Sequence, residues 1–423
     1  MPKSSLNRDR ISVQTRRSLL TGASGLAFSL AVINSSPAEA KTTQRKKKTA
    51  ASIAAQPAIS NGPPANTPIG PFDTSAQYAF IMDYNTGTVL LDKQADQPMH
   101  PSSLTKIMTC YVVFAMLSTG RIKLDQLLPV SEKAWRMQGS KMFVPLNAQV
   151  SVQDLIQGVI IQSGNDACIV LAEGIAGSEQ QFVAIMNDWA PKLGLKNTRF
   201  MNCTGWPDDN HLMSAHDIAL IAYHLIHDYP QYYHFFSEKE FTYNKITQGN
   251  RNVLVDKGLA DGLKTGHTSA GGYGLCASSE RNGRRIILVA NGMSSMNERA
   301  HECERLLQWG FNQFENVKLF NKGEVIETAP VWMGTSPTVS LVAGEDLLMT
   351  LPVGWRNKMK ISLDYNAPIA APITKGQVVQ ASLSVENGGQ AIQIPVIAGE
   401  SVPKSGLISR TFKNIGYHFG KKP

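Results

Sequence analysis

The stretch Pro101-Ser102-Ser103-Leu104-Thr105-Lys106-Ile107-Met108-Thr109 opens an apolar run that extends to Leu117. This run predicts a buried helix that begins at Ser103. Residues three apart share a helix face, so we expect Lys106 to lie beside Ser103. A serine hydroxyl is a poor nucleophile until a base accepts its proton, and a lysine can be that base when burial or a nearby positive charge lowers its pKa. The stretch therefore predicts Ser103 as a nucleophile and Lys106 as its general base.

Two further motifs follow in order, Ser163-Gly164-Asn165 and Lys264-Thr265-Gly266. The series S-x-x-K, S-x-N and K-T-G is typical of penicillin-binding proteins and serine β-lactamases. Lys264 would supply a second positive charge and hold a substrate carboxylate. Ser163 and Asn165 would position the scissile amide and relay protons. Free N–H groups at a helix start can form an oxyanion hole for the attacked carbonyl.

Each motif taken singly is weak. The chain has a second S-x-x-K at Ser401-Val402-Pro403-Lys404 and a second S-x-N at Ser295-Met296-Asn297. Both are out of order, and Pro403 would disrupt the helix that such a site needs. A capped core helix, a loop and a turn are the alternative interpretation of the single motifs, but the ordered set favours catalysis.

The sequence around the motifs, at residues 101–109, 158–168 and 261–273, resembles the low-molecular-mass D-alanyl-D-alanine carboxypeptidases. From about Tyr78 to the C-terminus it resembles the penicillin-binding protein 5 type of this peptidase S11-like family. The resemblance implies an α/β (α+β) catalytic domain of the serine β-lactamase/transpeptidase-like fold, an antiparallel sheet with helices, and a small C-terminal β-sandwich domain. It implies a serine-type D-Ala-D-Ala carboxypeptidase that removes the terminal D-alanine of peptidoglycan pentapeptides through a Ser103 acyl-enzyme and that β-lactams also acylate.

The resemblance also implies the substrate-binding residues. Lys264, Thr265 and Gly266 would bind the substrate, and the backbone N–H groups of Ser103 and His267 would form the oxyanion hole. The imidazole of His267 is then a spacer rather than a catalyst.

An arginine ten residues before a Trp-Gly-Phe binds the substrate's terminal carboxylate in the family. Trp309-Gly310-Phe311 places that arginine at Arg299. The alternative is a solvated helix charge paired with Glu298 or Glu302.

The net charge of +8 is concentrated in two tails. Residues 1–48 carry +8 and residues 404–423 carry +5, so the body between them is mildly acidic at −5. This distribution argues against a nucleic-acid groove and favours targeting or a membrane surface.

The N-terminus has the pattern of an export signal. Thr15-Arg16-Arg17-Ser18-Leu19-Leu20 precedes a weakly apolar run, and Ala38-Glu39-Ala40 fits signal peptidase. We expect a signal peptide at 1–40, exported by the twin-arginine route or by ordinary secretion. Residues 41–71, with the basic cluster Arg45–Lys48, should form a disordered tether.

The five cysteines give an odd count without C-x-x-C or Cys/His spacing, so neither a disulfide framework nor a zinc site is indicated. We expect no metal and no cofactor. Cys110 and Cys168 should be core residues, and Cys168 lies one helical turn past Asn165, which makes a thiol near the site an open possibility.

The pattern of the chain predicts a catalytic domain at 72–316 and a β-rich domain at 317–400. A hairpin is expected around Asn85-Thr86-Gly87, with mostly helical sequence over 103–235. Strands are expected at Gly262–Thr268, Gly274–Ser279 and Arg285–Asn291, and a helix from about Asn297 to Phe314. Short β runs separated by Pro and Gly should follow, at Ser340–Val342, Leu347–Leu351, Met359–Leu363, Val378–Val385 and Ala391–Val396.

Residues 401–423 should form an amphipathic membrane-anchor segment. Ile408, Phe412, Ile415 and Phe419 recur at helical spacing among basic residues. The segment is too short and polar to span a bilayer, so we expect it to lie in the interface. The protein would then be periplasmic and peripheral on the outer face of the cytoplasmic membrane.

Three functions compete on these motifs. The first is the carboxypeptidase, with peptidoglycan stem peptides ending in D-Ala-D-Ala as substrate. The second is a D,D-endopeptidase or a β-lactamase, although a class A β-lactamase would need S-D-N and a deacylating glutamate, and no E-x-x-L-N is present. The third is a non-catalytic envelope scaffold, which unbroken motifs disfavour.

Overall fold

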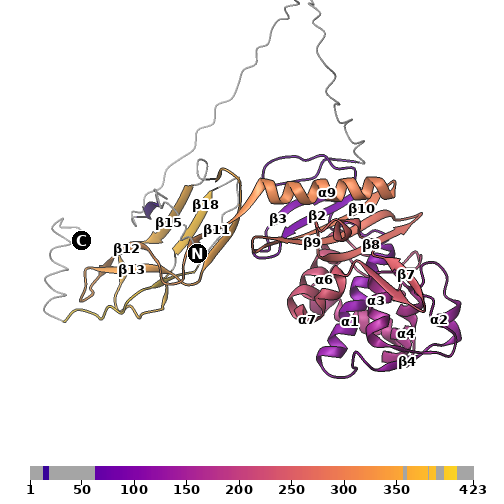
Figure 1. Ribbon diagram of the computed structural model, residues 1–423. Coiled ribbons are helices and arrows are strands. Elements are labelled where there is room, and N and C mark those ends of the chain that lie inside the picture. Colours follow the sequence, from indigo (N-terminus) through magenta and orange to yellow (C-terminus); the bar gives the residue numbers. More distant parts are fainter. Residues whose placement is uncertain (1–12, 19–61, 356–359, 380, 387–394, 407–423) are drawn as a thin grey trace, which may run out of the picture. The chain divides into compact units, whose positions relative to one another are not determined.

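The computed structural model describes residues 13–18, 62–355, 360–379, 381–386 and 395–406. The chain divides into two compact units (Figure 1). The larger unit comprises Ala58–Leu319 and Leu347–Lys358, and the smaller unit comprises Phe320–Asp346 and Met359–Pro423 together with Met1–Pro57. All three motifs lie in the larger unit.

A five-stranded sheet with the order β3–β2–β10–β9–β8 forms one layer of the larger unit, and every neighbouring pair is antiparallel. Its strands are Tyr78–Asp83 (β2), Val89–Lys93 (β3), Gly262–Thr268 (β8), Gly272–Arg281 (β9) and Arg284–Met293 (β10). The expected hairpin and the three later strands are confirmed. Because β8 ends the strand order, the K-T-G motif lies on an edge strand.

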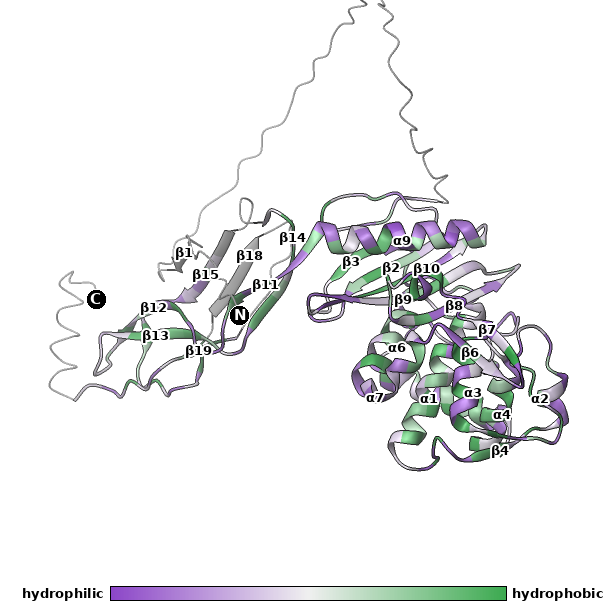
Figure 2. Cartoon of the chain, viewed as in Figure 1, coloured by the Kyte–Doolittle hydropathy of each residue, from purple (hydrophilic) through white to green (hydrophobic). Residues whose placement is uncertain are grey.

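Successive residues of β10 are buried in two different cores, because neighbouring side chains of a strand point to opposite faces. Ile287 and Val289 join the core that contains α1 (Lys106–Ser118). Ile286 and Leu288 pack with residues of α9 (Met296–Gln313). Helices therefore cover both faces, which explains the nearly continuous apolar run of β10 (Figure 2).

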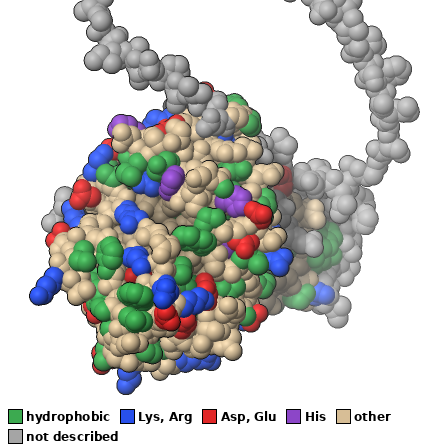
Figure 3. Space-filling view, turned by 90° about the vertical axis from the view of Figure 1, so that its right-hand side faces the viewer, with side chains coloured by type: hydrophobic (Ala, Val, Ile, Leu, Met, Phe, Trp, Pro, Cys, Tyr) green, Lys and Arg blue, Asp and Glu red, His purple; other side chains and the backbone are tan. Residues whose placement is uncertain are grey.

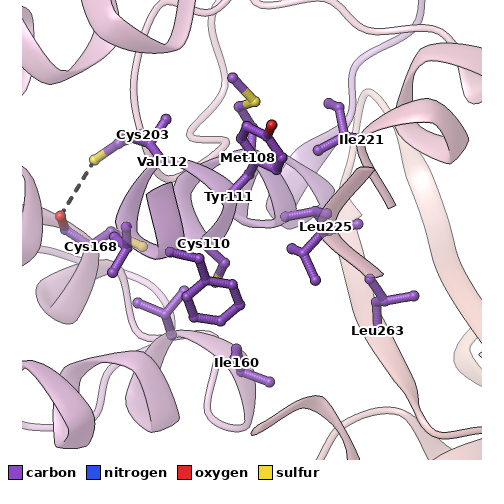
Figure 4. Packing of buried hydrophobic residues seen from close by; sticks show 14 of the residues in the cluster. Met108, Cys110, Tyr111, Val112, Ile160, Cys168, Cys203, Ile221, Leu225 and Leu263 are labelled. Atoms are coloured by element: carbon purple, nitrogen blue, oxygen red, sulfur yellow. Dashed lines mark hydrogen bonds between the residues drawn. The ribbon is translucent and has the colours of Figure 1, made fainter. Parts of the chain in front are cut away.

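The helix α1 is the centre of the layer opposite α9, and every residue from Lys106 to Leu117 is buried. In Figure 4 its Met108 and Tyr111 lie among Ile221 and Leu225. The other helices of the unit are Glu132–Arg136 (α2), Val152–Ile160 (α3), Asn165–Ala176 (α4), Glu179–Trp189 (α5), Ala215–Asp228 (α6), Pro230–Tyr233 (α7) and Val253–Asp256 (α8). Two small hairpins pair Leu127–Pro129 (β4) with Gln149–Ser151 (β5), and Glu240–Tyr243 (β6) with Ile246–Gly249 (β7).

The α-helix at the first motif begins later than we expected. Ser102–Thr105 form a 3₁₀ turn (η1), and α1 starts at Lys106. Ser102 has a φ of 52°, and this left-handed residue separates the turn from the chain before it. Residues i and i+3 of a 3₁₀ turn eclipse each other, so Ser103 and Lys106 still meet.

The smaller unit is β-rich, as expected for the C-terminal domain. One sheet has the order β16–β12–β13–β19–β17 and another has the order β1–β15–β18. The strands are Val13–Ser18 (β1), Val325–Trp332 (β12), Thr338–Ala343 (β13), Lys360–Asn366 (β15), Ile369–Ala370 (β16), Val378–Val379 (β17), Ala381–Glu386 (β18) and Val396–Ala398 (β19).

One strand from the stretch expected to form the β-rich domain packs with the larger unit. Phe314–Phe320 (β11) pairs with Leu347–Pro352 (β14), and Thr350 hydrogen bonds to Thr86 and Asn316. The strand Leu347–Pro352 therefore packs with the larger unit, although it lies within the expected range 317–400 of the β-rich domain.

The first residues of the expected anchor segment, 401–406, pack on the β-rich unit. Val402 pairs with Ile373, and the Ser405 hydroxyl donates to the Gly334 carbonyl at 2.5 Å. Residues 401–406 are therefore held by the β-rich unit. The rest of the expected anchor, 407–423, lies outside the described residues.

The expected export signal and tether are described only in small part. The described residues 62–71 of the tether are not disordered as expected, because Ala65 is buried and pairs with Phe72 and Asn66 pairs with Asp92. Val13–Ser18 pair in parallel with Lys360–Asn366, while residues 1–12 and 19–61 lie outside the described residues. Within the described part of the chain, no helix has the length and apolar character needed to cross a membrane.

Candidate active site

Lys106 and Ser103 meet as the first motif predicts. Lys106 Nζ lies 3.0 Å from Ser103 Oγ, and the lysine is fully buried. The same nitrogen lies 2.8 Å from Asn165 Oδ1 and 2.6 Å from the carbonyl oxygen of Thr204. Three oxygen atoms therefore surround the amine, and one of them belongs to the expected nucleophile.

Burial lowers the pKa of Lys106, and the positive charge of Arg251 lowers it further. The pKa of Lys264 is held well below its ordinary value, mainly by burial and then by the charges of Lys106 and Arg251. A buried amine loses the hydration that stabilises its ammonium form, and a second cation nearby acts in the same direction. The site therefore favours the neutral amine that a general base requires.

The second motif lies at the start of α4. Ser163 is buried and has a φ of 57°, a conformation that non-glycine residues rarely adopt. Asn165 is the first residue of the helix, and its Nδ2 donates to the Gln138 carbonyl at 2.7 Å. The amide is thus held from both ends, by Gln138 and by Lys106.

A buried carboxylate fixes the loop beside this motif. Asp166 accepts hydrogen bonds from the backbone N–H groups of Met142, Phe143 and Val144 at 2.9–3.2 Å. Charge-assisted bonds to backbone N–H groups are strong. Asp166 therefore ties α4 to the segment that contains Ser140. This role was not among the residues expected from the sequence, although an acid directly after an S-x-N motif, in the first turn of a helix, is a usable signal.

The third motif lies against the nucleophile turn. Lys264 and Thr265 are buried, and Lys264 Nζ donates to the Thr265 carbonyl at 3.1 Å. A Cβ on Gly266 would lie 3.1 Å from the Pro101 carbonyl oxygen and 3.2 Å from Ser103 N. Glycine at this position lets the β8 backbone approach Ser103 closely.

The ring of His267 stacks on Tyr273, with the ring centroids 3.9 Å apart. Tyr273 in turn lies under the guanidinium of Arg299, 5.8 Å from the ring centroid. The two side chains on β8 and β9 and the arginine on α9 thus form one stack.

Arg299 is buried on α9, and burial lowers its pKa. The ion pairs that we considered as an alternative are not formed in the described structure. Glu298 accepts from Ser294, whereas Glu302 accepts from Thr74 and Arg305. Arg299 is therefore a buried cation whose nearest helix acids are engaged elsewhere.

Arg251 is a site residue that the sequence analysis missed. Its Nη1 donates to Ser140 Oγ at 2.5 Å, and its charge lowers the pKa of both Lys106 and Lys264. A single arginine within Gly249-Asn250-Arg251-Asn252 forms no motif, so no sequence signal could have identified it.

The thiols are structural. All five cysteines are buried and free. Cys203 Sγ donates to the Cys168 carbonyl at 3.7 Å (Figure 4), and burial raises the pKa of Cys168 to about 11. A thiol with this pKa stays protonated at neutral pH, so it is no competing nucleophile. Among the described residues, no group of His, Cys, Asp and Glu is arranged to hold a metal ion.

The surface shown in Figure 3 carries Lys and Arg side chains interspersed with Asp and Glu. A small cavity of about 140 Å³ opens beside η1, lined by residues that include Ser102, Trp206, His211 and Thr268.

A serine–lysine pair with a fully buried lysine lies between an S-x-N loop and a K-T-G edge strand, on a sheet covered by helices. This arrangement defines a serine hydrolase of the penicillin-binding class. The D-alanyl-D-alanine carboxypeptidase family model matches residues 64–295, and the model of the penicillin-binding protein 5 C-terminal domain matches residues 314–404. The chain belongs to the D-alanyl-D-alanine carboxypeptidase family.

Individual relatives agree with this assignment. The chain is 43% identical to D-alanyl-D-alanine carboxypeptidase DacC of Escherichia coli over 341 residues, 78% of this chain and 85% of the relative. It is 43% identical over 318 residues to DacA of Haemophilus influenzae, 74% of this chain and 81% of the relative. The solved structure of penicillin-binding protein 5 from Haemophilus influenzae has a TM-score of 0.69 at 40% identity, covering 79% of this chain and 99% of that one.

Proposed function

We propose that this chain is a serine-type D-Ala-D-Ala carboxypeptidase that releases the terminal D-alanine of peptidoglycan stem pentapeptides. The arrangement around Lys106 Nζ carries the proposal. A neutral amine has two N–H groups and one lone pair. When the two N–H groups donate to Asn165 Oδ1 and the Thr204 carbonyl, the lone pair is left for the hydroxyl of Ser103.

In the acylation step, Ser103 Oγ attacks the carbonyl carbon of the penultimate D-alanine while Lys106 Nζ accepts the hydroxyl proton. The backbone N–H groups of Ser103 and His267 stabilise the oxyanion. The tetrahedral intermediate then collapses and its peptide C–N bond breaks. The leaving amine takes the proton from Lys106 by way of Ser163, so that free D-alanine departs and an ester remains on Ser103.

Deacylation repeats these roles with water. A water molecule attacks the ester carbonyl and gives a proton to Lys106. The C–O bond to Ser103 then breaks, and the serine oxygen recovers the proton. The stem tetrapeptide leaves as a carboxylic acid, and the enzyme returns to its starting state without any cofactor.

Lys264 and Arg299 are two buried basic side chains, and the carboxylate at the end of a substrate would favour the charged form of each. Lys264 is 2% exposed and Arg299 is 6% exposed. In the described part of the chain, neither side chain forms a salt bridge with an acidic residue. An unpaired charge in such surroundings is costly, and an anionic ligand offsets the cost. Lys264 and Thr265, with Arg299, would therefore bind the terminal carboxylate.

The same chemistry predicts acylation by β-lactams, because the strained lactam amide presents the same bond to Ser103. A D,D-endopeptidase shares every catalytic step and differs only in the amine that leaves. A β-lactamase would differ in deacylating the β-lactam ester rapidly. A non-catalytic scaffold would need neither the neutral lysine nor the close Ser103 contact.

The test is an incubation of the purified enzyme with pentapeptide and, separately, with crosslinked muropeptide, followed by mass spectrometry. We expect loss of one D-alanine from the pentapeptide, and covalent labelling by fluorescent penicillin. The Ser103→Ala variant should lose both activities, whereas Lys133→Ala, which changes an exposed lysine, should keep them. Labelling of the Ser103→Ala protein would exclude the assignment of the nucleophile.

We further propose that the enzyme acts in the periplasm, peripheral to the cytoplasmic membrane. One support is the export-signal pattern at residues 1–40. The other is the segment 407–423, in which apolar residues recur at helical spacing among basic residues. Anionic headgroups would attract that C-terminal charge. Fractionation of cells that produce the full chain, with and without residues 407–423, tests this location.

A further inference from the structure

The carbonyl group of Ser102 is held by a line of buried side chains that leads away from the reacting atoms. Thr105 Oγ1 donates to the Ser102 carbonyl at 2.9 Å and lies 2.8 Å from His211 Nε2. At the far side of the imidazole, the backbone N–H of Met201 donates to His211 Nδ1 at 3.1 Å. Ser102, Thr105 and His211 are each exposed by 3% or less.

The donor inventory fixes the direction of each bond. Thr105 has a single O–H, and the Ser102 carbonyl takes it, so the Thr105 oxygen accepts a hydrogen bond from His211 Nε2. His211 Nδ1 accepts from Met201 and therefore carries no hydrogen. The imidazole is thus neutral with its proton on Nε2. Burial, the largest cause, lowers the pKa of His211 to about 4, which keeps this form at neutral pH.

The Ser102 carbonyl matters because it shares a peptide unit with the N–H of Ser103. The carbonyl and the N–H of a planar trans peptide point in opposite directions, so fixing one orients the other. The Ser103 N–H is one of the two oxyanion donors in the proposed mechanism. An oxyanion donor acts only when it points at the position where the charge develops.

This peptide unit needs support, because Ser102 has a φ of 52°. Non-glycine residues keep such a conformation only when their surroundings enforce it. The Ser102 hydroxyl lies 2.8 Å from Thr268 Oγ1, which holds the side chain, but the carbonyl depends on Thr105. Gly205 closes the other side, since a Cβ there would lie 1.8 Å from the Ser102 carbonyl oxygen.

We infer that His211 is a positioning residue for acyl transfer, which acts through Thr105 to orient the Ser102–Ser103 peptide and so aim the Ser103 N–H at the oxyanion. The inference rests on the proposed function. His211 itself does not contact the reacting atoms in this arrangement. The required chemical feature is the N–H at the Nε2 position, and this feature can be kept or removed by substitution.

The test compares His211→Gln with His211→Asn. A glutamine amide can place an N–H where Nε2 stands, whereas the shorter asparagine amide reaches only the Nδ1 position. Thr105→Ser and Thr105→Val form a second pair that keeps or removes the hydroxyl at similar volume. The measurements are the rate of β-lactam acylation, kcat and KM for D-alanine release, and the thermal unfolding midpoint.

We expect His211→Asn and Thr105→Val to lower kcat and the acylation rate by about 100-fold, as for loss of an oxyanion donor, with little change in KM. His211→Gln and Thr105→Ser should restore most of the rate. If His211→Asn does not fold, the Thr105 pair decides the outcome by the same comparison.

Acylation at the parental rate in the folded His211→Asn or Thr105→Val variant would overturn the inference. Equal losses in the Gln and Asn variants would also overturn it, since a purely structural site does not distinguish their amide positions. A change confined to KM would show that His211 contacts the substrate from the neighbouring cavity instead. Failure of the proposed function is distinguishable, because the parent protein would then release no D-alanine and bind no penicillin.

Discussion

Lys106 Nζ and Asn165 Oδ1 lie 2.8 Å apart, although 59 positions separate the two residues in the chain. The contact joins the first residue of α1 to the first residue of α4 and so unites two motifs in one site. Asn165 is itself anchored by the Gln138 carbonyl, which leaves its amide little freedom to turn. The amide therefore fixes which way the lone pair of a neutral Lys106 points.

Replacing Asn165 by aspartate should slow acylation at neutral pH. A carboxylate beside the amine favours the ammonium form, so the pKa of Lys106 rises and less of the neutral base is present. In the parent enzyme, activity should increase with pH as Lys106 loses its proton. The midpoint of this ascending limb should lie below the pKa of a free lysine, because burial lowers the pKa of Lys106. In Asn165→Asp this limb should move to higher pH, and the rate at pH 7 should fall by about 100-fold.

The measurement is the β-lactam acylation rate as a function of pH. Asn210→Asp, which adds the same charge at an exposed position, serves as the control. Coincident profiles for the parent and Asn165→Asp would contradict a lysine base held by this amide.

Removal of the charge of Arg251 should shift the same limb in the same direction. The guanidinium lowers the pKa of Lys106 and of Lys264, so Arg251→Met should raise both and move the activity profile to higher pH. Arg251→Lys keeps the charge and should move the profile less. The two lysines titrate as a coupled pair, so the profile reports the pair rather than either residue. A profile unchanged in Arg251→Met would show that solvent screens this charge.

Gly266→Ala should damage acylation without unfolding the protein. The added Cβ would lie 3.1 Å from the Pro101 carbonyl oxygen and 3.2 Å from Ser103 N, so β8 or the nucleophile turn must shift by a few tenths of an ångström. A misaligned oxyanion donor costs about 100-fold in rate. Gly249→Ala is the control, since its Cβ would meet nothing closer than 3.9 Å. Penicillin labelling kinetics and the unfolding midpoint, measured together, distinguish misalignment from instability.

The sequence predicted those parts of the site whose chemistry imposes a spacing. Ser103 and Lys106 must be three residues apart to share a face, and this holds even though the structure uses a 3₁₀ turn in place of an α-helix. The turn itself was not predictable, because the left-handed Ser102 is held by Thr268, a residue on a distant strand. Tertiary contacts of this kind leave no local pattern.

Arg251 and the segment Leu347–Lys358 show two further limits. A lone arginine has no periodicity and forms no motif. Only the folded chain reveals that Arg251 bonds to Ser140 and lowers the pKa of the two site lysines. The strand Leu347–Pro352 lies within the range matched by the penicillin-binding protein 5 C-terminal domain, yet it pairs with Phe314–Phe320 and packs with the larger unit. Which strand an apolar run joins depends on non-local pairing rather than on propensity.

The stability of the larger unit should depend strongly on the pair formed by Arg284 and Asp83. Arg284 Nε donates to Asp83 Oδ2 at 2.8 Å, and the carboxylate side chain is fully buried. Arg284→Ala would leave that charge uncompensated at a cost of about 3 to 5 kcal/mol. Arg136→Ala breaks an exposed pair with Glu132 and should cost only about 0.5 kcal/mol. Urea unfolding of both variants gives the comparison, and similar losses in the two would refute it.

Membrane attachment should depend on residues beyond Gly406 rather than on those beyond Val402. The backbone N–H groups of Thr335 and Ser405, with the Ser405 hydroxyl, bond the segment 403–405 to the smaller unit. Truncation after Val402 removes these three bonds and should destabilise that unit by on the order of 2 kcal/mol.

Truncation after Gly406 keeps the bonds and removes Arg410, Lys413, Lys421 and Lys422, each worth roughly 1 kcal/mol near an anionic surface. The protein truncated after Gly406 should therefore keep its D-alanine release and its unfolding midpoint while it no longer sediments with anionic vesicles. Continued sedimentation would move the anchor to another basic segment, and Arg45–Lys48 would be the next to remove.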